Sequence, residues 1–173
     1  MDHLSDVVTE RLLLRPVTAG HLSAVAAGRR LPGWAPDFPS EGDLVIAGML
    51  DRNGVPVGPD TVFGQRLVVE RDTGLVVGGI GLFGPPEDGR VELGYGIVES
   101  RRGHGYATEA ARAMVEMALG LPGVTEVVAG VDPTNGASVR VLEKAGLSFR
   151  SHDGAEAQYA VSEPPVGPRT PGV

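Results

Sequence analysis

The middle of the chain alternates apolar and polar residues with a period of two, which predicts β-strands. Two such segments, 64–70 and 75–83, flank the turn residues 71–74 and predict a hairpin. A second turn at 85–90 leads into a strand over 91–98. Successive side chains of a strand point to opposite faces. One face therefore carries Val91, Leu93, Tyr95 and Ile97, and the other carries Glu92, Gly94, Gly96 and Val98.

The spacing of the apolar residues becomes helical after this strand. From 107 to 119 they recur every three or four positions, with charged residues on the remaining face. The apolar segment 124–131 then predicts another strand. Asn135 can cap a helix that runs to Ala145 and ends at Gly146.

The N-terminal third predicts one strand and two helices. The strand covers 10–15, and the helices cover about 18–28 and about 40–50, each with a capping residue at its start. Short final strands are expected near Phe149 and at 156–161. We therefore expect an α+β fold with a mixed central sheet whose last strands are joined by helical crossovers.

Length and composition predict one soluble domain without thiol or metal chemistry. The 173 residues fit a single domain, which we assign to 1–162, and we expect the proline-rich tail 163–173 to be disordered. There is no cysteine, and the four histidines are scattered, so no metal site is predicted. The net charge of −7 argues against a nucleic-acid partner. Without a visible signal peptide or an apolar run of about 20 residues, no membrane contact and a cytoplasmic location are expected.

The segment 101–110 (RRGHGYATEA) joins the predicted strand to the predicted helix and has the composition of an anion site. The first N–H groups of a helix lack partners within it, and the helix dipole adds positive charge there. Gly103 and Gly105 permit positive φ and close approach of the backbone, and either arginine can contact a phosphate. A tight turn that merely requires glycine explains the segment equally well. A P-loop tripeptide is absent, and Thr108 replaces the third glycine of a dinucleotide fingerprint.

Residues 102–107 (RGHGYA) match the Q/R-x-x-G-x-G/A signature of the GNAT acyl-CoA-dependent N-acetyltransferases. The chain also resembles this superfamily, in the same order and spacing, at 9–16 (TERLLLRP), 92–110 (ELGYGIVESRRGHGYATEA) and 135–147 (NGASVRVLEKAGL). These segments look most like the branch of ribosomal-protein N-terminal acetyltransferases and their small-molecule-modifying relatives. The resemblance covers nearly the whole chain up to about Tyr159.

The resemblance implies the GNAT fold, in which two central parallel strands, here 91–98 and 124–131, splay apart around coenzyme A. Acetyl-CoA is then the co-substrate, and no metal is required. The implied contacts are the backbone of Ile97 and Val98 with the pantetheine arm, the amides of Arg102, Gly103, His104, Gly105, Tyr106, Ala107 and Thr108 with the diphosphate, and Asn135 and Ser138 with the pantetheine and thioester end.

Acetyl transfer to an amine requires a base for the amine and a donor for the carbonyl oxygen. Glu92 is the candidate base, because we expect its face of the strand, shared with Gly94 and Gly96, to meet the cofactor. Some histone acetyltransferases of the superfamily carry their glutamate at this offset. A purely structural Glu92 is the alternative, with Glu156 as a second candidate base. The amide of Val98 is the expected oxyanion donor.

The departing thiolate requires a proton or a hydrogen bond. Many relatives place a tyrosine in the later helix where this chain has Leu142. In the ribosomal-protein branch the serine of N-x-x-S has been assigned this role, so Ser138 is the candidate acid. A serine that only satisfies the helix start is the alternative, and Tyr159 is a second candidate acid.

The acceptor amine is expected to contact the loop 31–39. There Trp34 and Phe38, with Asp37, suit a cationic amine, although the aromatic rings can equally anchor a proline-rich loop. The sequence as a whole predicts an N-acetyltransferase acting on a protein N-terminus or a small-molecule amine. A catalytically inactive CoA-binding sensor or scaffold is the first alternative, and a nucleotide-binding protein is the second. Dimers are frequent in the family, which leaves a homodimer open.

Overall fold

The computed structural model describes residues 6–54, 57–58 and 61–163. Its eight strands form one sheet in the order β1-β2-β3-β4-β5-β6-β8-β7, and β5 pairs with β6 in parallel while every other neighbouring pair is antiparallel. The predicted α+β class with a mixed sheet is confirmed. The strands are β1 (Val7–Val8), β2 (Leu12–Pro16), β3 (Gln65–Glu70), β4 (Val76–Glu87), β5 (Arg90–Ile97), β6 (Glu126–Val131), β7 (Ser148–Asp153) and β8 (Glu156–Val161). The helices are α1 (Ala19–Ala26), α2 (Glu41–Arg52), the 3-10 turn η1 (Glu99–Arg101), α3 (Tyr106–Leu119) and α4 (Gly136–Lys144).

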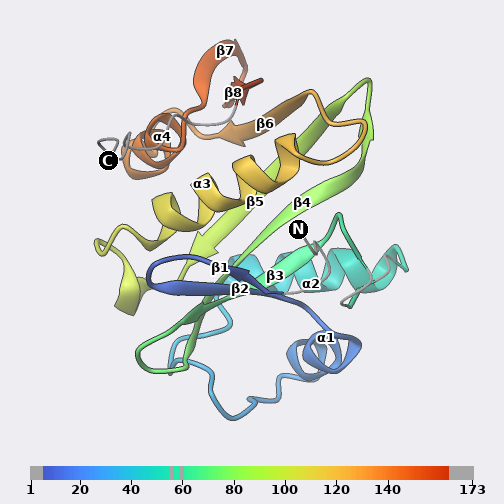
Figure 1. The fold of residues 1–173 in the computed structure, drawn as a ribbon. Helices are drawn as coiled ribbons and strands as arrows, with labels where there is room; N and C mark the ends of the chain where they lie inside the picture. Colours follow the sequence, from blue (N-terminus) through green and yellow to red (C-terminus); the bar gives the residue numbers. More distant parts are fainter. Residues whose placement is uncertain (1–5, 55–56, 59–60, 164–173) are drawn as a thin grey trace, which may run out of the picture.

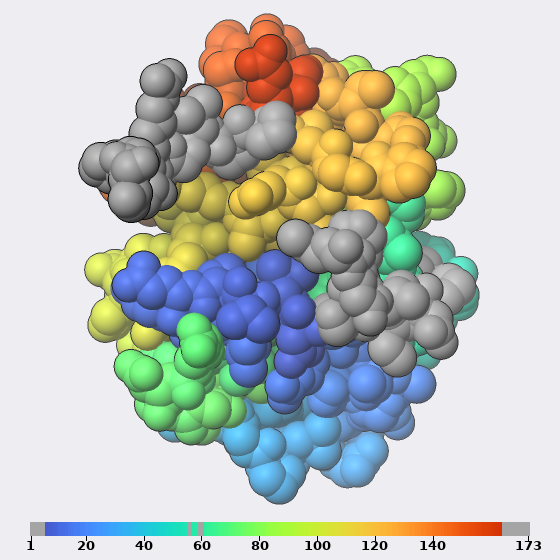
Figure 2. Space-filling view, viewed as in Figure 1, coloured from blue at the N-terminus to red at the C-terminus, as the bar shows by residue number. Residues whose placement is uncertain are grey.

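Helices cover both faces of the sheet (Figure 1). α3 and α4 lie on one face, with α3 running across β5, whereas α1 and α2 pack on the other face near β3 and β4. Figure 2 shows α3 between the N-terminal strands and the C-terminal segments. Its inner side buries Ala110, Ala111, Met114, Val115, Met117 and Ala118. No helix in the described part of the chain is long and apolar enough to cross a membrane.

The predicted helix caps are present. The Thr18 side chain accepts a hydrogen bond from the His21 backbone, and the Ser40 side chain accepts one from the Asp43 backbone. Asn135 accepts a hydrogen bond from the Ser138 N–H at the start of α4. These side chains satisfy N–H groups that have no partner within the helix.

The turn between β4 and β5 is tighter than predicted. β4 continues through both prolines to Glu87, which pairs with Arg90, so the turn consists of Asp88 and Gly89 alone. Both residues have positive φ, 49° and 78°, as a two-residue hairpin turn requires. β3 stops pairing with β4 at Gly81. Pro85 and Pro86, which have no N–H to donate, lie beyond that point, so the β3–β4 pairing loses no hydrogen bond to them.

Candidate active site

A cleft opens where β5 and β6 stop pairing. Their parallel register ends at the pair Glu92–Val128, and beyond it the strands separate. The resulting cleft has a volume of about 510 Å³. It is lined by Tyr95, Gly96 and Ile97 of β5, by Arg101, Arg102, Gly103, Gly105, Tyr106, Ala107 and Thr108 of the following loop and α3, and by Asn135, Ala137, Ser138, Arg140, Val141 and Lys144 at α4. Of the predicted cofactor contacts, Val98 and His104 are not part of this lining.

The separated edge of β5 offers free backbone groups to the cleft. The Val98 N–H donates to the Val77 carbonyl at 2.9 Å, so Val98 points its backbone toward β4. Because hydrogen-bonded positions alternate along an antiparallel pair, Gly96 also faces β4, and the backbone groups of Tyr95 and Ile97 face the cleft. The expectation that the Val98 amide is the oxyanion donor and pairs with the pantetheine arm is therefore wrong, since that N–H already has an acceptor. The Ile97 carbonyl receives a hydrogen bond from Arg102 Nε at 3.1 Å.

The loop between β5 and α3 presents a row of unused amides. Gly103 and Gly105 both have φ of 80°, a conformation that glycine adopts without strain. Among the described residues, the N–H groups of 103–108 donate no hydrogen bond, and Glu109 is the first to bond back into the helix, to the Gly105 carbonyl. Free amides at a helix N-terminus suit a phosphate or diphosphate. This geometry is compatible with the predicted anion site, which stays a prediction.

Cations surround these amides. The cleft lining includes Arg101, Arg102, Arg140 and Lys144, and it contains no carboxylate. This local excess of positive charge stands against a net charge of −7 for the chain. Sequence reasoning missed Arg140 and Lys144; their spacing of four, on the face of α4 that also carries Ala137 and Val141, is the signal that could have found them. The cleft is electrostatically suited to a polyanion.

Two hydroxyl groups meet inside the cleft. The Tyr95 hydroxyl lies 3.2 Å from Ser138 Oγ and donates to the Ser138 carbonyl at 3.3 Å. Burial raises the pKa of Tyr95, and the contact with Ser138 counteracts it in part. The structure therefore brings Ser138 together with a tyrosine from β5 that the sequence interpretation did not select. Leu142, where many relatives have a tyrosine, is only 1 % exposed and lies in the core.

Both candidate bases lie near the point where β5 and β6 separate. Glu92 has the strand parity opposite to Tyr95, so its side chain lies on the other face of the sheet, outside the cleft lining. Partial burial raises the pKa of Glu92, and the charge of Glu156 raises it further. The Glu156 carboxylate lies over Gly130 of β6 and accepts a hydrogen bond from Gln158 at 2.8 Å. Tyr159 is 7 % exposed and packs edge-on against Phe149.

The aromatic residues of the loop 31–39 are part of the core. Trp34 and Phe38 are 6 % and 2 % exposed and pack edge to face, with ring centroids 5.0 Å apart. They line a cavity of only about 40 Å³ between the sheet and helices α1 and α2. Asp37 turns outward and accepts two hydrogen bonds from Ser100, at 2.9 and 2.7 Å, which lower its pKa. This geometry favours loop anchoring over contact with an acceptor.

The described residues contain no group of three or more His, Cys, Asp or Glu side chains arranged to bind a metal. Fold and cleft together have the geometry and charge that suit a phosphorylated ligand in the gap of a splayed mixed sheet. A family model, the acetyltransferase (GNAT) domain, matches residues 11–148. The chain therefore belongs to the GNAT acetyltransferase family, and the predicted family is confirmed.

Individual relatives agree with this assignment. An uncharacterized N-acetyltransferase of Bacillus subtilis, YjdG, is 34% identical over 98 residues, which are 56% of this chain and 58% of that protein. The chain thus spans less than two thirds of this curated relative. A putative ribosomal-protein-serine acetyltransferase from Vibrio cholerae has a TM-score of 0.66 at 21% identity, covering 94% of this chain and 100% of that chain. Mycobacterium smegmatis RimJ in complex with CoA-disulfide has a TM-score of 0.59 at 20% identity, covering 87% and 81%. These two likenesses confirm the fold.

Proposed function

We propose that the protein transfers the acetyl group of acetyl-CoA to a primary amine by direct attack in a ternary complex. The observation that carries the proposal is the row of free amides at 103–108, beside four cations, at the open end of the gap between β5 and β6. The amides suit the diphosphate of coenzyme A, and Arg102, Arg140 and Lys144 supply positive charge for its phosphates. The backbone groups of Tyr95, which face the cleft, can pair with the amide groups of the pantetheine arm, as a neighbouring strand would.

The acceptor would approach from the opposite face of the sheet, where Glu92 and Glu156 lie. In the reaction the amine nitrogen attacks the thioester carbonyl carbon and loses a proton to Glu92, directly or through a water molecule. Its pKa, raised by partial burial and by Glu156, makes Glu92 a better base than an ordinary carboxylate. The negative charge that develops on the carbonyl oxygen is stabilised by the N–H of Ile97, which faces the cleft.

The carbon–sulfur bond then breaks, and the thiolate leaves with a hydrogen bond or a proton from the Ser138 hydroxyl. Tyr95 lies 3.2 Å from Ser138 Oγ and can return a proton to it. The products are the acetylated amine and free coenzyme A. A pair of carboxylates at the approach of the amine favours a positively charged acceptor, either a protein N-terminus or a small-molecule amine.

The test combines binding with turnover. Purified protein is heated with and without millimolar acetyl-CoA, and release of free thiol is then followed across a panel of N-terminal peptides, amino acids and polyamines. We expect a higher melting temperature with acetyl-CoA and thiol release with at least one amine, which Glu92→Gln reduces strongly. A folded protein whose melting temperature does not respond to acetyl-CoA would refute the proposal.

The absence of a tyrosine at position 142 favours a second candidate, a CoA-binding sensor or scaffold without catalysis. Leu142 is buried, so no hydroxyl reaches the cleft from that position of α4. This candidate predicts CoA binding without thiol release for any amine of the panel. It also predicts that Glu92→Gln leaves CoA binding and any downstream function unchanged.

A further inference from the structure

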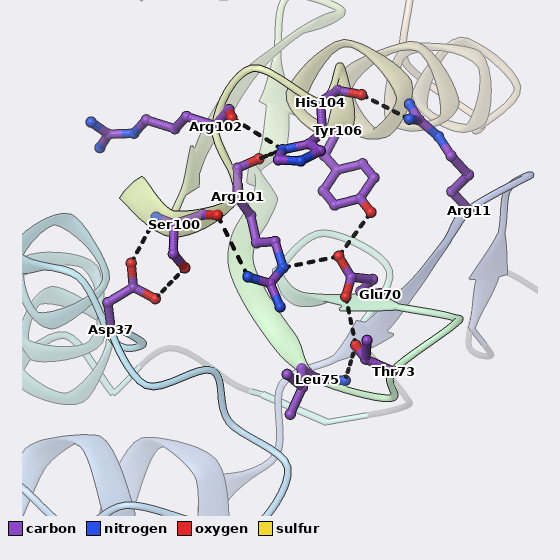
Figure 3. Close-up of polar contacts among 10 residues, drawn as sticks. All are labelled: Arg11, Asp37, Glu70, Thr73, Leu75, Ser100, Arg101, Arg102, His104 and Tyr106. Carbon is purple, nitrogen blue, oxygen red and sulfur yellow. Dashed lines mark hydrogen bonds and ion pairs between the residues drawn. The ribbon is translucent and has the colours of Figure 1, made fainter.

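Glu70, the last residue of β3, is a buried carboxylate that does not line the cleft. It lies beneath the loop 102–105, to which we assigned the diphosphate. It is 6 % exposed and accepts three side-chain hydrogen bonds (Figure 3). Thr73 donates to Oε1 at 2.6 Å, and Tyr106 and Arg101 donate to Oε2 at 2.8 and 3.1 Å. The bond from Thr73, followed by those from Tyr106 and Arg101, keeps the pKa of Glu70 below its ordinary value despite burial.

Two of these donors stand at the two ends of the loop. Arg101 precedes the loop residues 102–105, and Tyr106 is the first residue of α3. Oε2 of Glu70 therefore connects both ends of the loop to the end of strand β3. That point is itself fixed, because the backbone of Glu70 bonds to Leu75 and Gly74 across the β3–β4 turn.

A second contact fixes the direction of the loop amides. Arg11 donates from Nη1 to the His104 carbonyl at 2.7 Å, and its guanidinium lies 4.9 Å from the Tyr106 ring centroid. Since the C=O and N–H of a trans peptide point in opposite directions, this contact turns the Gly105 N–H away from Arg11. Glu109 holds Arg11 in place through a 2.7 Å ion pair.

We propose that Glu70 is a positioning residue for diphosphate recognition: by holding Arg101 and Tyr106 it keeps the amides of 103–108 aligned before the ligand arrives. The inference rests on the proposed use of acetyl-CoA and adds a residue that touches no part of the ligand. Because Arg101 is engaged by Glu70, the diphosphate is bound by aligned amides and by the other cations of the cleft. A binding loop that is already ordered loses less conformational entropy on binding.

The test compares two ligands that differ in the diphosphate. Coenzyme A carries it, together with an adenosine 3′-phosphate, whereas pantetheine contains the thiol arm alone. Binding of each is measured for the original protein, for Glu70→Gln, and for Glu116→Gln, a control on the exposed side of α3. We expect Glu70→Gln to raise the dissociation constant for coenzyme A about tenfold, the usual scale for losing a charged hydrogen-bond partner. Pantetheine binding in Glu70→Gln, and both ligands in Glu116→Gln, should be unchanged.

The outcomes separate this inference from the function on which it rests. If the original protein binds no coenzyme A, the proposed function fails. If it binds, but Glu70→Gln binds coenzyme A equally well or loses both ligands to the same extent, the positioning role is overturned. Should Glu70→Gln fail to fold by circular dichroism, Tyr106→Phe decides with the same two ligands. That variant removes the hydrogen bond from Tyr106 to Glu70, and it must weaken binding of coenzyme A without weakening binding of pantetheine.

Discussion

The hydroxyl groups of Tyr95 and Ser138 lie 3.2 Å apart, and neither residue alone accounts for a proton donor in the cleft. The Ser138 hydroxyl has an ordinary position at the first turn of α4, where its N–H already bonds to Asn135. The Tyr95 hydroxyl contacts that hydroxyl inside the cleft and, under the proposed mechanism, would supply a second proton. At the scale of single residues, our proposal gives this pair the role that a tyrosine at position 142 has in many relatives.

Tyr95→Phe should therefore lower kcat by about tenfold while the KM for acetyl-CoA changes little, because the ring still packs and only the hydroxyl is lost. Initial rates with an acceptor from the amine panel, measured over a range of acetyl-CoA concentrations, give kcat and KM separately. Ser138→Ala should give a similar loss, and the double variant should lose little more than either single variant. Fully additive losses would show that the two hydroxyls act separately.

The two carboxylates near the acceptor can be told apart by pH. The charge of Glu156 raises the pKa of Glu92, so removing that charge lowers the pKa and keeps the base ionised in more acidic solution. Glu156→Gln should shift the acid limb of the kcat/KM profile to lower pH while activity at neutral pH persists. If Glu156 is itself the base, the same variant loses activity at every pH.

At the scale of elements, the period of the apolar residues was sufficient to predict strands β3 to β6 and helix α3, which follows the loop 102–105. The glycines and the helix start at 101–110 favoured an anion site no more than a tight turn, and the N–H groups of 103–108, which donate no hydrogen bond among the described residues, are compatible with the anion site. The Val98 N–H is already bonded to β4, and side-chain alternation does not reveal which backbone groups of a strand are bonded to its neighbour. Arg140 and Lys144 were missed because the side of α4 that faces the cleft depends on how that helix packs.

The sequence also does not reveal packing in the loop 31–39, which is why the structure differs there from the expected acceptor contact. A tryptophan and a phenylalanine beside an aspartate have the composition of a cation site, but composition does not reveal burial. Packing placed both rings in the core and turned Asp37 toward Ser100. Glu70 could not be selected from the sequence either, since two of its three donors, Arg101 and Tyr106, lie 31 and 36 residues away along the chain.

The loop itself provides a test at this scale. Gly105→Ala forces a side chain into positive φ, at a cost of about 1–2 kcal/mol, and its Cβ would meet Arg11 Nη2 at 3.3 Å. We expect a lower melting temperature and clearly weaker coenzyme A binding by calorimetry. Gly154→Ala is the matched control, because it has φ of 59° with open space around it in the β7–β8 turn. Gly154→Ala should lower the melting temperature and leave binding of coenzyme A unchanged.

At the scale of the whole molecule, an acidic protein carries one strongly basic cleft. The net charge of −7 repels extended polyanions, whereas the cations of the cleft attract a small one at close range. This distribution of charge favours binding of a small, nucleotide-sized polyanion in the cleft over binding of an extended one elsewhere on the surface.

The affinity for coenzyme A should consequently fall with salt. Raising NaCl from about 50 mM to about 500 mM should increase the dissociation constant by about tenfold, since salt screens exposed charges over these distances. Titrations at several salt concentrations measure the slope. Lys144→Gln should make the slope shallower, and an unchanged slope in that variant would remove Lys144 from the phosphate contacts.

The gap between β5 and β6 leaves an edge inside the sheet rather than at its border. The amide protons of Tyr95 and Ile97 point into that gap, so in the free protein they are open to exchange with solvent while their neighbour Gly96 is protected by β4. A ligand lying in the gap would act as the missing strand and slow the exchange of every second amide. Hydrogen–deuterium exchange along β5 would then read out occupancy of the site without knowledge of the acceptor amine.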